Sequence, residues 1–479
     1  MRVKIIFHAV IFLLFSSSQL LAQNHKLIYD QLRKPQDAVY HHVPLGLCED
    51  YPEETTTLEI IRNDMEVLKR SGINLLRISF GWDSIEERKD EYNWLFWDDY
   101  VKMAVDEYGI TLIPYICYTP QWNSTGDTSN FWNHTPKDYE EFGEFVGILV
   151  NRYKDRIKTW ELWNEPDIKA YWSGTAEDLA RIVKIGAEAV RKADSTAIVV
   201  CPGLAGHTEF TLALFKDYGI SPYVDVVNLH NYFETWHPSP IEAIVPYVND
   251  VANIIKQYGD NQSLWMAEVG YSTFRRNGYV SDWATAYYDY EHTPEFQAVQ
   301  LIRTLALLLS TEKLAAIAWY EIKDLPPGDE VIGDVNNRHL GVTYVDYKPK
   351  PAEAALSFFN KLFAQKHRCI DTQVAIKRPN DSDSEVHSFE NEDGSVIVVG
   401  WLRTKVSGKQ SDDKSGNVKD TRKESIALTL PMKLAGKATL YDELGNAREF
   451  TSIERQAGST TLKNVALVGG EIAIIKITK

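Results

Sequence analysis

The chain has 479 residues, which is enough for two domains with large hydrophobic cores. Its formal net charge of −16 argues against nucleic acid and anionic membrane surfaces as partners. The four cysteines are too few for a disulfide scaffold, and no Cys/His spacing resembles a zinc site. Cys117 and Cys201 lie in apolar runs and are expected to be buried thiols, whereas a bridge between Cys48 and Cys369 stays open.

The N-terminus predicts a secretory signal peptide over residues 1–22. Arg2 and Lys4 form a basic start, an apolar stretch follows, and Ala22 ends a suitable cleavage site. The apolar stretch is too short to span a bilayer, no later segment has a membrane-spanning pattern, and no cysteine follows the cleavage site to carry a lipid anchor. The mature chain is therefore expected to be secreted or periplasmic, without membrane insertion.

From Val43 onward, short apolar runs alternate with helical patterns. The runs predict strands over Val43–Leu47, Ile73–Phe80, Ile110–Ile116, Lys158–Trp163, Ala197–Cys201, Val224–Leu229, Ser263–Glu268 and Ala315–Glu321. The patterns between and after them predict helices over Leu58–Ser71, Leu95–Tyr108, Asp138–Tyr153, Ala176–Ala193, Glu209–Asp217, Ile241–Tyr258, Glu295–Ser310 and Pro351–Phe363. Eight such units favour a (β/α)8 TIM barrel over residues 23–365, rather than an open sheet with a Gly-rich phosphate loop.

The pattern changes after Phe363, and residues 366–479 predict a small all-β sandwich that supports the barrel. Period-two alternation predicts strands over Val374–Lys377, Ser395–Leu402, Ser425–Leu430, Lys437–Tyr441 and Glu471–Thr478. Asp393-Gly394 and Leu444-Gly445-Asn446 are typical of turns. The polar segment 404–424 predicts a loop, and residues 24–42 could add one more strand to the sandwich.

The most informative stretch is T-W-E-L-W-N-E-P-D, from Thr159 to Asp167. Pro166 cannot extend a strand, so Asn164 and Glu165 are expected where the fourth strand ends. The carboxyl ends of parallel strands are where ligands bind in such folds. A Glu can transfer a proton and an Asn can bind a sugar hydroxyl, although a helix start with an acidic first turn would also suit E-P-D.

A second carboxylate, Glu268, closes the seventh strand in S-L-W-M-A-E-V-G-Y. A carboxylate at the end of a buried strand is costly unless it is paired or faces a cleft. Barrel geometry places the ends of strands four and seven across the mouth from each other, so Glu165 and Glu268 are the predicted catalytic pair of a glycoside hydrolase. A separation near ~5 Å would indicate retention at the anomeric carbon, and a wider gap inversion.

Arg77 lies among apolar residues of the second strand, in N-L-L-R-I-S-F. A buried cation needs an anion. Arg77 therefore either keeps the nucleophilic carboxylate ionised or forms a structural salt bridge inside the barrel, for instance with Glu161.

Further substrate-binding candidates lie at other strand ends. Tyr232 and His230 end the sixth strand; Tyr232 could donate to the nucleophile, and His230 could orient a sugar hydroxyl or a carboxyl group, or be a satisfied polar residue only. Trp319 in the eighth strand could form the floor of the sugar site, with a core role as the alternative. Trp122, beyond the third strand, is a weaker candidate.

Together, W-N-E-P, W-M-A-E, R-I-S, L-H-N-Y and A-W-Y resemble the motifs of a clan A glycoside hydrolase over residues 43–365. The segments E-Y-N-W-L-F-W-D and L-G-V-T-Y-V-D-Y-K-P-K-P-A are similar to family 39, and next to relatives near family 5. The resemblance implies retention, with Glu165 as acid/base, Glu268 as nucleophile and Asn164 on the 2-hydroxyl. It implies no metal and no organic cofactor.

These observations predict a secreted glycosidase that acts on oligosaccharides or polysaccharides. The long aromatic loop Tyr271–His292 could wall one side of the cleft and favours an exo-acting, β-xylosidase-like enzyme. An endo-acting β-glucanase or mannanase, a transglycosylase and a retired barrel that only binds carbohydrate are the alternatives. The pattern makes no prediction of oligomeric state.

Overall fold

The computed structural model describes residues 29–33, 38–50, 56–284, 286–328, 333–405 and 416–479. The predicted signal peptide lies outside the described residues, as do residues 406–415 of the predicted polar loop. Among the helices that are described, none combines the length and apolar character that a bilayer crossing needs.

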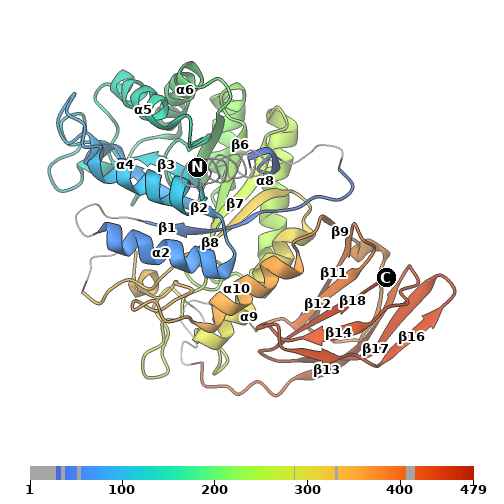
Figure 1. Cartoon of the computed structure of the whole chain (residues 1–479). Coiled ribbons are helices and arrows are strands. Elements are labelled where there is room, and N and C mark those ends of the chain that lie inside the picture. Colours follow the sequence, from blue (N-terminus) through green and yellow to red (C-terminus); the bar gives the residue numbers. More distant parts are fainter. Residues whose placement is uncertain (1–28, 34–37, 51–55, 285, 329–332, 406–415) are drawn as a thin grey trace, which may run out of the picture.

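A closed barrel forms the first and larger part of the described structure (Figure 1). Its strands follow one another in chain order, are parallel throughout, and close where the first pairs with the eighth. They are β1 (Leu45–Glu49), β2 (Leu75–Gly81), β3 (Thr111–Cys117), β4 (Thr159–Glu161), β5 (Ile198–Leu204), β6 (Val226–Asn231), β7 (Ser263–Val269) and β8 (Leu314–Tyr320). The predicted (β/α)8 barrel is thereby confirmed.

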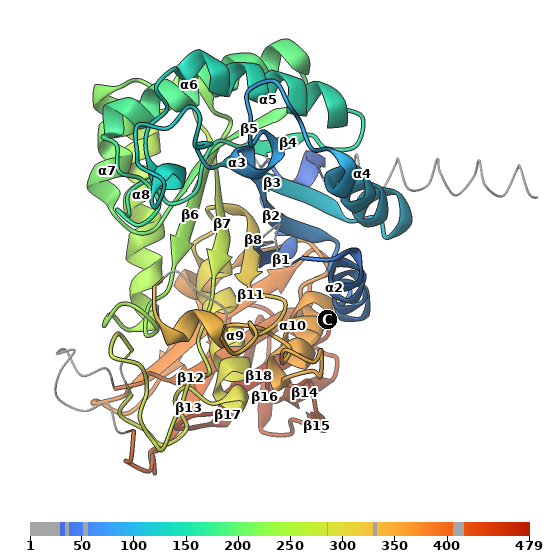
Figure 2. The same ribbon diagram turned by 90° about the vertical axis from the view of Figure 1, so that its left-hand side faces the viewer.

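Helices cover the outside of the barrel (Figure 2). The α-helices are α2 (Leu58–Ser71), α3 (Trp82–Ile85), α4 (Leu95–Val101), α5 (Tyr139–Tyr153), α6 (Ala176–Ala193), α7 (Thr208–Leu212), α8 (Ile244–Tyr258), α9 (Pro294–Ser310) and α10 (Pro351–Leu362). Two predicted helices finish as π-helical segments, η1 (Lys102–Glu107) after α4 and η3 (Ala213–Asp217) after α7. Short 3-10 turns are η2 (Phe131–Asn133), η4 (Ser221–Tyr223), η5 (Ile241–Ala243), η6 (Val335–Arg338) and η7 (Asp371–Gln373).

Local capping explains why α2 has the predicted bounds. The Thr57 hydroxyl accepts from the backbone of Ile60 at its start, and Gly72 ends the helix with a φ of 71° that favours glycine.

The N-terminal end of the barrel is closed by the segment 29–33. Leu32 is fully buried in the barrel interior, and its carbonyl accepts from Nε1 of Trp265, near the start of β7, at 2.8 Å. The open end is therefore the opposite one, where the strands finish. This is the end at which TIM barrels carry their active sites.

Two antiparallel sheets follow the barrel and form the predicted sandwich. One has the order β10-β13-β17-β16 and the other β15-β14-β18-β12-β11-β9. Their bounds are β9 (His367–Cys369), β10 (Ala375–Lys377), β11 (Ser384–Asn391), β12 (Val396–Leu402), β13 (Lys423–Leu430), β14 (Ala438–Tyr441), β15 (Ala447–Glu449), β16 (Ile453–Gln456), β17 (Ser459–Val468) and β18 (Ile472–Ile477).

Several sandwich strands were not expected from the sequence: β9, β11, β15, β16 and β17. β17 contains Asn464 with a φ of 54°, and its register with β13 shifts, so the period-two pattern is interrupted. The extra strand expected from residues 24–42 is, within the part described, a single bridge between His41 and His367.

The possible disulfide does not form, because all four cysteines are free thiols. Cys48 lies inside the barrel and its Sγ donates to the carbonyl of Ala267 at 2.8 Å, whereas Cys369 lies in the sandwich. Cys117 and Cys201 are buried, as expected.

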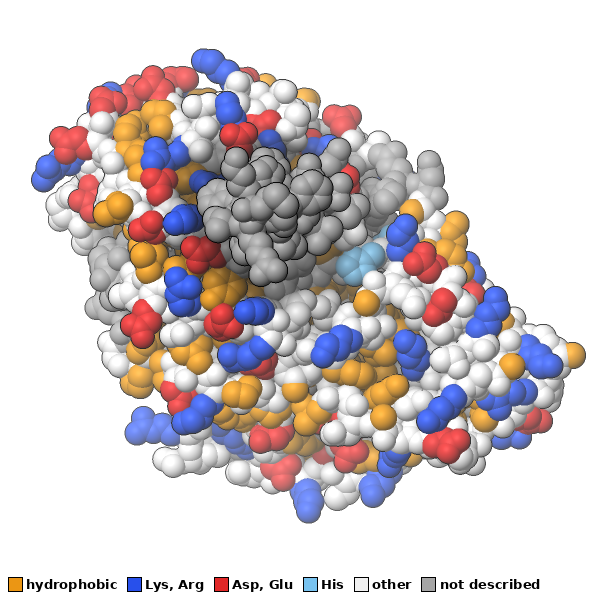
Figure 3. Space-filling model, in the orientation of Figure 1, with side chains coloured by type: hydrophobic (Ala, Val, Ile, Leu, Met, Phe, Trp, Pro, Cys, Tyr) orange, Lys and Arg blue, Asp and Glu red, His pale blue; other side chains and the backbone are white. Residues whose placement is uncertain are grey.

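Helix α9 joins the barrel to the sandwich. Its buried Arg303 donates to Thr404 at 2.8 Å and to Glu242 at 3.1 Å, and Glu242 also accepts from the indole of Trp401 at 2.9 Å. Phe389 and Trp401 belong to the same hydrophobic core as the barrel helices. On the described part of the face in Figure 3, basic and acidic side chains are interspersed and form no continuous basic patch.

Candidate active site

The backbone turns sharply after β4. Trp163 has a φ of 106° and Glu165 a φ of 41°, a left-handed conformation that costs roughly 1–2 kcal/mol in a non-glycine residue. The Glu165 amide donates to the carbonyl of Gly203 at 2.9 Å, and Asn164 forms a parallel bridge with the same glycine. A Cβ on Gly203 would lie 2.0 Å from Nε2 of His230, so a larger residue would displace that imidazole. This tight turn directs Asn164 and Glu165 into the barrel mouth.

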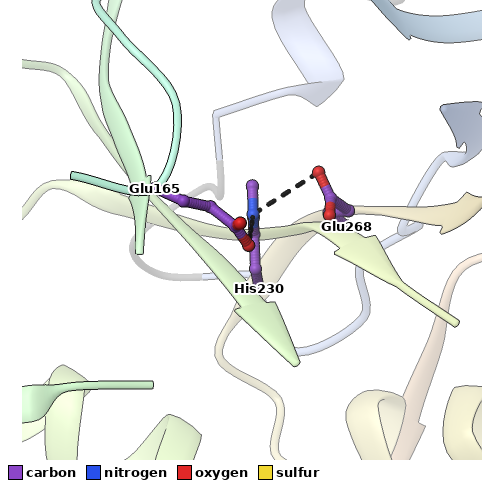
Figure 4. Close-up of side chains that lie close together, drawn as sticks. All are labelled: Glu165, His230 and Glu268. Atoms are coloured by element: carbon purple, nitrogen blue, oxygen red, sulfur yellow. Dashed lines mark hydrogen bonds and ion pairs between the residues drawn. The ribbon is translucent and has the colours of Figure 1, made fainter. Parts of the chain in front are cut away.

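Glu165, His230 and Glu268 converge at the mouth from the ends of β4, β6 and β7 (Figure 4). Nδ1 of His230 lies 2.9 Å from Oε1 of Glu165 and 3.4 Å from Oε2 of Glu268. One oxygen of each carboxylate and this nitrogen all lie within 4.8 Å of one another. Both carboxylates are largely buried, with 5% of Glu165 and 8% of Glu268 exposed. Strands four and seven thus bring the two predicted carboxylates together.

Arg77 connects the catalytic candidates to the barrel interior. Its Nε and Nη2 donate to the two oxygens of Glu161 at 2.8 and 3.0 Å. Its Nη1 donates to Oε2 of Glu268 at 2.8 Å, and Nη2 also donates to Oδ1 of Asn164 at 2.7 Å. Arg77 therefore forms the internal salt bridge with Glu161 and contacts Glu268 at the same time, because a guanidinium has five donors in a fixed plane. Its face lies 4.3 Å from the ring centre of Tyr115.

Glu268 accepts hydrogen bonds on both oxygens, since the Tyr232 hydroxyl donates to Oε1 at 2.7 Å. Burial raises the pKa of Glu268 to about 7, although the Arg77 cation lowers it. Burial and then the nearby Glu268 charge raise the pKa of Glu165 well above its ordinary value. Of the two carboxyls, Glu268 is the better stabilised as an anion, and Glu165 the better proton carrier.

The tautomer of His230 follows from its neighbours. Oδ1 of Asn228 accepts from the backbone amide of Ala267 at 2.9 Å, which fixes the amide orientation. Nδ2 of Asn228 therefore donates to Glu161 at 3.0 Å and faces Nε2 of His230 at 3.3 Å. Nε2 accepts, so Nδ1 carries the hydrogen and donates to Glu165. Burial, and then the Arg77 charge, lower the pKa of His230 well below its ordinary value, so the ring is neutral.

Two predicted substrate-binding residues are not brought to this site. Trp319 is 1% exposed and lies in the core between barrel and helices. Side chains alternate along a strand, so the next residue, Tyr320, is the one that faces inward, with its ring 6.3 Å from that of Tyr232. Nε1 of Trp122 donates to the carbonyl of Glu86 at 2.9 Å, and its ring packs in the loop after β3.

Asp50 is a residue at this mouth that the sequence interpretation missed. It follows β1 directly, and its carboxylate accepts from the hydroxyls of Tyr115 and, at 3.2 Å, Tyr320. The signal was available, because Asp50 ends a buried strand just as Glu165 and Glu268 do.

The spacing of Glu165, His230 and Glu268 would also suit three ligands of a metal ion. Arg77 already places a cation 2.8 Å from Glu268, and the Nδ1 hydrogen of His230 points at Glu165. These contacts favour an acid–base site over a metal centre.

The family model described as "Glycosyl hydrolases family 39" matches residues 45–430. A curated relative, "Beta-xylosidase" from Caldicellulosiruptor saccharolyticus, is 33% identical over 109 residues, covering 20% of this chain and 22% of the relative. The match thus spans about a fifth of that relative's length.

Solved structures share the fold. A family 39 glycoside hydrolase from Bacteroides cellulosilyticus WH2 has a TM-score of 0.62 and 16% identity, covering 94% of this chain and 82% of that one. A monomeric beta-xylosidase from Caulobacter crescentus CB15 has a TM-score of 0.61 and 17% identity, covering 91% of this chain and 96% of that one.

Proposed function

The chain belongs to glycosyl hydrolases family 39, and from this membership we propose that it is a retaining β-glycosidase that releases single sugars from oligosaccharides, in the manner of a β-xylosidase. The observation that carries the proposal is the pair of buried carboxylates, Glu165 and Glu268, facing each other at the mouth of the barrel. The substrates are oligosaccharides derived from plant or microbial polysaccharides.

In the first step Glu268 attacks the anomeric carbon while Glu165 protonates the departing oxygen, and a covalent glycosyl-enzyme forms. In the second step Glu165 takes a proton from water, which attacks the anomeric carbon and frees Glu268. Because His230 donates to Oε1 of Glu165, the other oxygen, Oε2, is the one that exchanges the proton.

Retention is supported by the short distance between the two carboxylates. Oxygens within 4.8 Å of each other leave no room for the water that an inverting pair holds across ~6.5–9.5 Å. Arg77 and Tyr232 stabilise the Glu268 anion, as a nucleophile requires. Because Arg77 occupies Oδ1 of Asn164, the amide hydrogens of Asn164 are the groups left to bind the sugar 2-hydroxyl.

Exo-action is supported by the loop from Tyr271 to His292 between β7 and α9. Its Ser272 amide donates to Thr235, after β6, at 3.3 Å, and Asn336, after β8, donates to the Thr235 carbonyl at 3.3 Å. Three neighbouring loops are thereby linked into one wall, which suits a pocket better than an open groove. The name of the curated relative, "Beta-xylosidase", favours xylose as the sugar.

Secretion is part of the same proposal. The basic and apolar pattern of residues 1–22 supports export to the periplasm or the exterior, where oligosaccharide substrates are met.

The test is a screen of the mature chain on aryl β-glycosides and oligosaccharides, with the anomeric form of the first product followed by NMR. We expect release of one sugar from the non-reducing end, with the β-anomer appearing first. First appearance of the α-anomer would contradict retention. Internal cleavage of long chains would establish the endo-acting alternative. Binding of oligosaccharides without turnover would indicate a retired enzyme.

The pH profile of kcat/KM is expected to be bell-shaped, with its acid limb displaced well above the ordinary range of a glutamate. Glu268 must be ionised to attack, so the rate rises with pH through its raised pKa of about 7. Glu165 has a pKa raised well above its ordinary value, and the rate falls as it deprotonates. Measurements with an aryl β-glycoside from pH 4 to 10 check this; an acid limb near ~4.3, the value of a free glutamate, would contradict it.

A further inference from the structure

Asp50 is an acidic group at the barrel mouth that the mechanism above does not use. It ends β1, and its side chain is exposed, unlike those of Glu165 and Glu268. Oδ1 accepts from the Tyr115 hydroxyl and Oδ2 from the Tyr320 hydroxyl, so the carboxylate is held between two rings. Each carboxylate oxygen has two acceptor positions, and within the described part of the chain each accepts one hydrogen bond, which leaves one position on each oxygen for a ligand.

The two tyrosines tie Asp50 to the groups that hold the nucleophile. The Tyr115 ring lies 4.3 Å from the Arg77 guanidinium, which donates to Glu268. The Tyr320 ring contacts Tyr232 edge-on at 6.3 Å, and Tyr232 also donates to Glu268. Asp50 is therefore connected to Glu268 through two residues on each side, and its charge acts on Glu268 and Glu165.

We propose that Asp50 is a specificity-determining residue of the sugar pocket, which accepts hydrogen bonds from hydroxyls of a neutral sugar and excludes sugars that carry a carboxylate. The inference rests on the proposed function and deepens it. A rigid carboxylate with one free acceptor position on each oxygen matches two neighbouring hydroxyls on one sugar ring.

Exclusion of acidic sugars follows from the charges at the mouth. Asp50, Glu165 and Glu268 are three acidic groups around Arg77, which is already engaged by Glu161 and Glu268. A uronic acid would add a further carboxylate without an unengaged cation to pair with in this group. Like charges brought together with little water between them repel strongly.

The test compares Asp50→Asn with wild type on two aryl β-glycosides of the same aglycone, the glucoside and the glucuronide, which differ only at C6. The wild type's best neutral aryl glycoside is measured beside them. Loss of a charged acceptor is expected to lower kcat/KM on that substrate by about 10- to 100-fold, mostly through KM. The ratio of glucuronide to glucoside kcat/KM is expected to rise at least ~10-fold, because the repelling charge is removed.

The matched control is Asp155→Asn, which removes the same charge from an exposed position between α5 and β4, at the closed end of the barrel. Asp155→Asn should leave unchanged both kcat/KM on the best neutral substrate and the ratio of glucuronide to glucoside kcat/KM. Where direct cleavage is slow, glucuronate and glucose are used as competitive inhibitors of the best substrate. The ratio of their inhibition constants then measures the discrimination between the charged and the neutral sugar.

An unchanged ratio in Asp50→Asn, with wild type active on neutral glycosides, would overturn this inference and leave the proposed function intact. A wild type inactive on every neutral glycoside would overturn the proposed function, and the role of Asp50 with it.

Discussion

Replacing Glu268 with Gln is expected to abolish nearly all turnover, lowering kcat by a factor on the order of 10⁴ or more. The amide keeps the shape of the carboxylate and still accepts from Tyr232, but it cannot attack the anomeric carbon. Substrate binding should be largely retained, because KM reflects contacts that the substitution leaves in place. Steady-state kinetics on an aryl β-glycoside measure both quantities, and substantial turnover in Glu268→Gln would make the assignment wrong.

Azide separates the roles of the two glutamates. In Glu268→Ala, azide can enter the space of the lost carboxylate and attack from that side, so the expected product is the α-glycosyl azide. In Glu165→Ala, Glu268 still forms the covalent intermediate, and azide then opens it from the opposite side to give the β-glycosyl azide. The reverse pattern of products would mean that Glu165 is the nucleophile and Glu268 the acid/base.

The positions of both glutamates follow from a rule that needs no structure. A carboxylate that ends a buried strand is either paired or facing a cleft, and in a parallel barrel all such strand ends meet at one mouth. The same rule points to Asp50, which the predicted strand Val43–Leu47 missed because β1 runs on to Glu49. An error of two residues in a strand end was enough to hide it.

The sequence does not settle which face of a barrel strand a residue occupies. β8 reads L-A-A-I-A-W-Y and is buried throughout, so hydrophobicity does not distinguish the side facing the barrel interior from the side facing the helices. Trp319 and Tyr320 are equally plausible from the pattern, and only the register of β8 against β1 puts Tyr320 inside. For Arg77, the sequence left a salt bridge with Glu161 and a contact with the nucleophilic carboxylate as alternatives. In the structure the guanidinium contacts both Glu161 and Glu268.

Replacing Arg77 with Met is expected to lower both stability and activity. Glu161 is fully buried and would lose its cation, and breaking a buried pair from one side costs about 3–5 kcal/mol. Glu268 and Asn164 would also lose the donors that position them, and removal of one such donor typically lowers kcat by about 10²–10³-fold. Chemical denaturation measures the first effect and kcat the second.

The double variant Arg77→Met/Glu161→Gln separates these two effects. The amide oxygen at position 161 still accepts from Gly203 and Asn228, which donate to Glu161 at 2.7 and 3.0 Å, but no unpaired charge stays buried. Much of the lost stability should return, since the penalty in the single variant comes from the uncompensated Glu161 anion. Activity should stay low, because the contact with Glu268 is still missing. Recovery of both would mean that Arg77 acts on catalysis only by keeping the barrel folded, and recovery of neither would mean that its contacts with Glu268 and Asn164 also hold the mouth together.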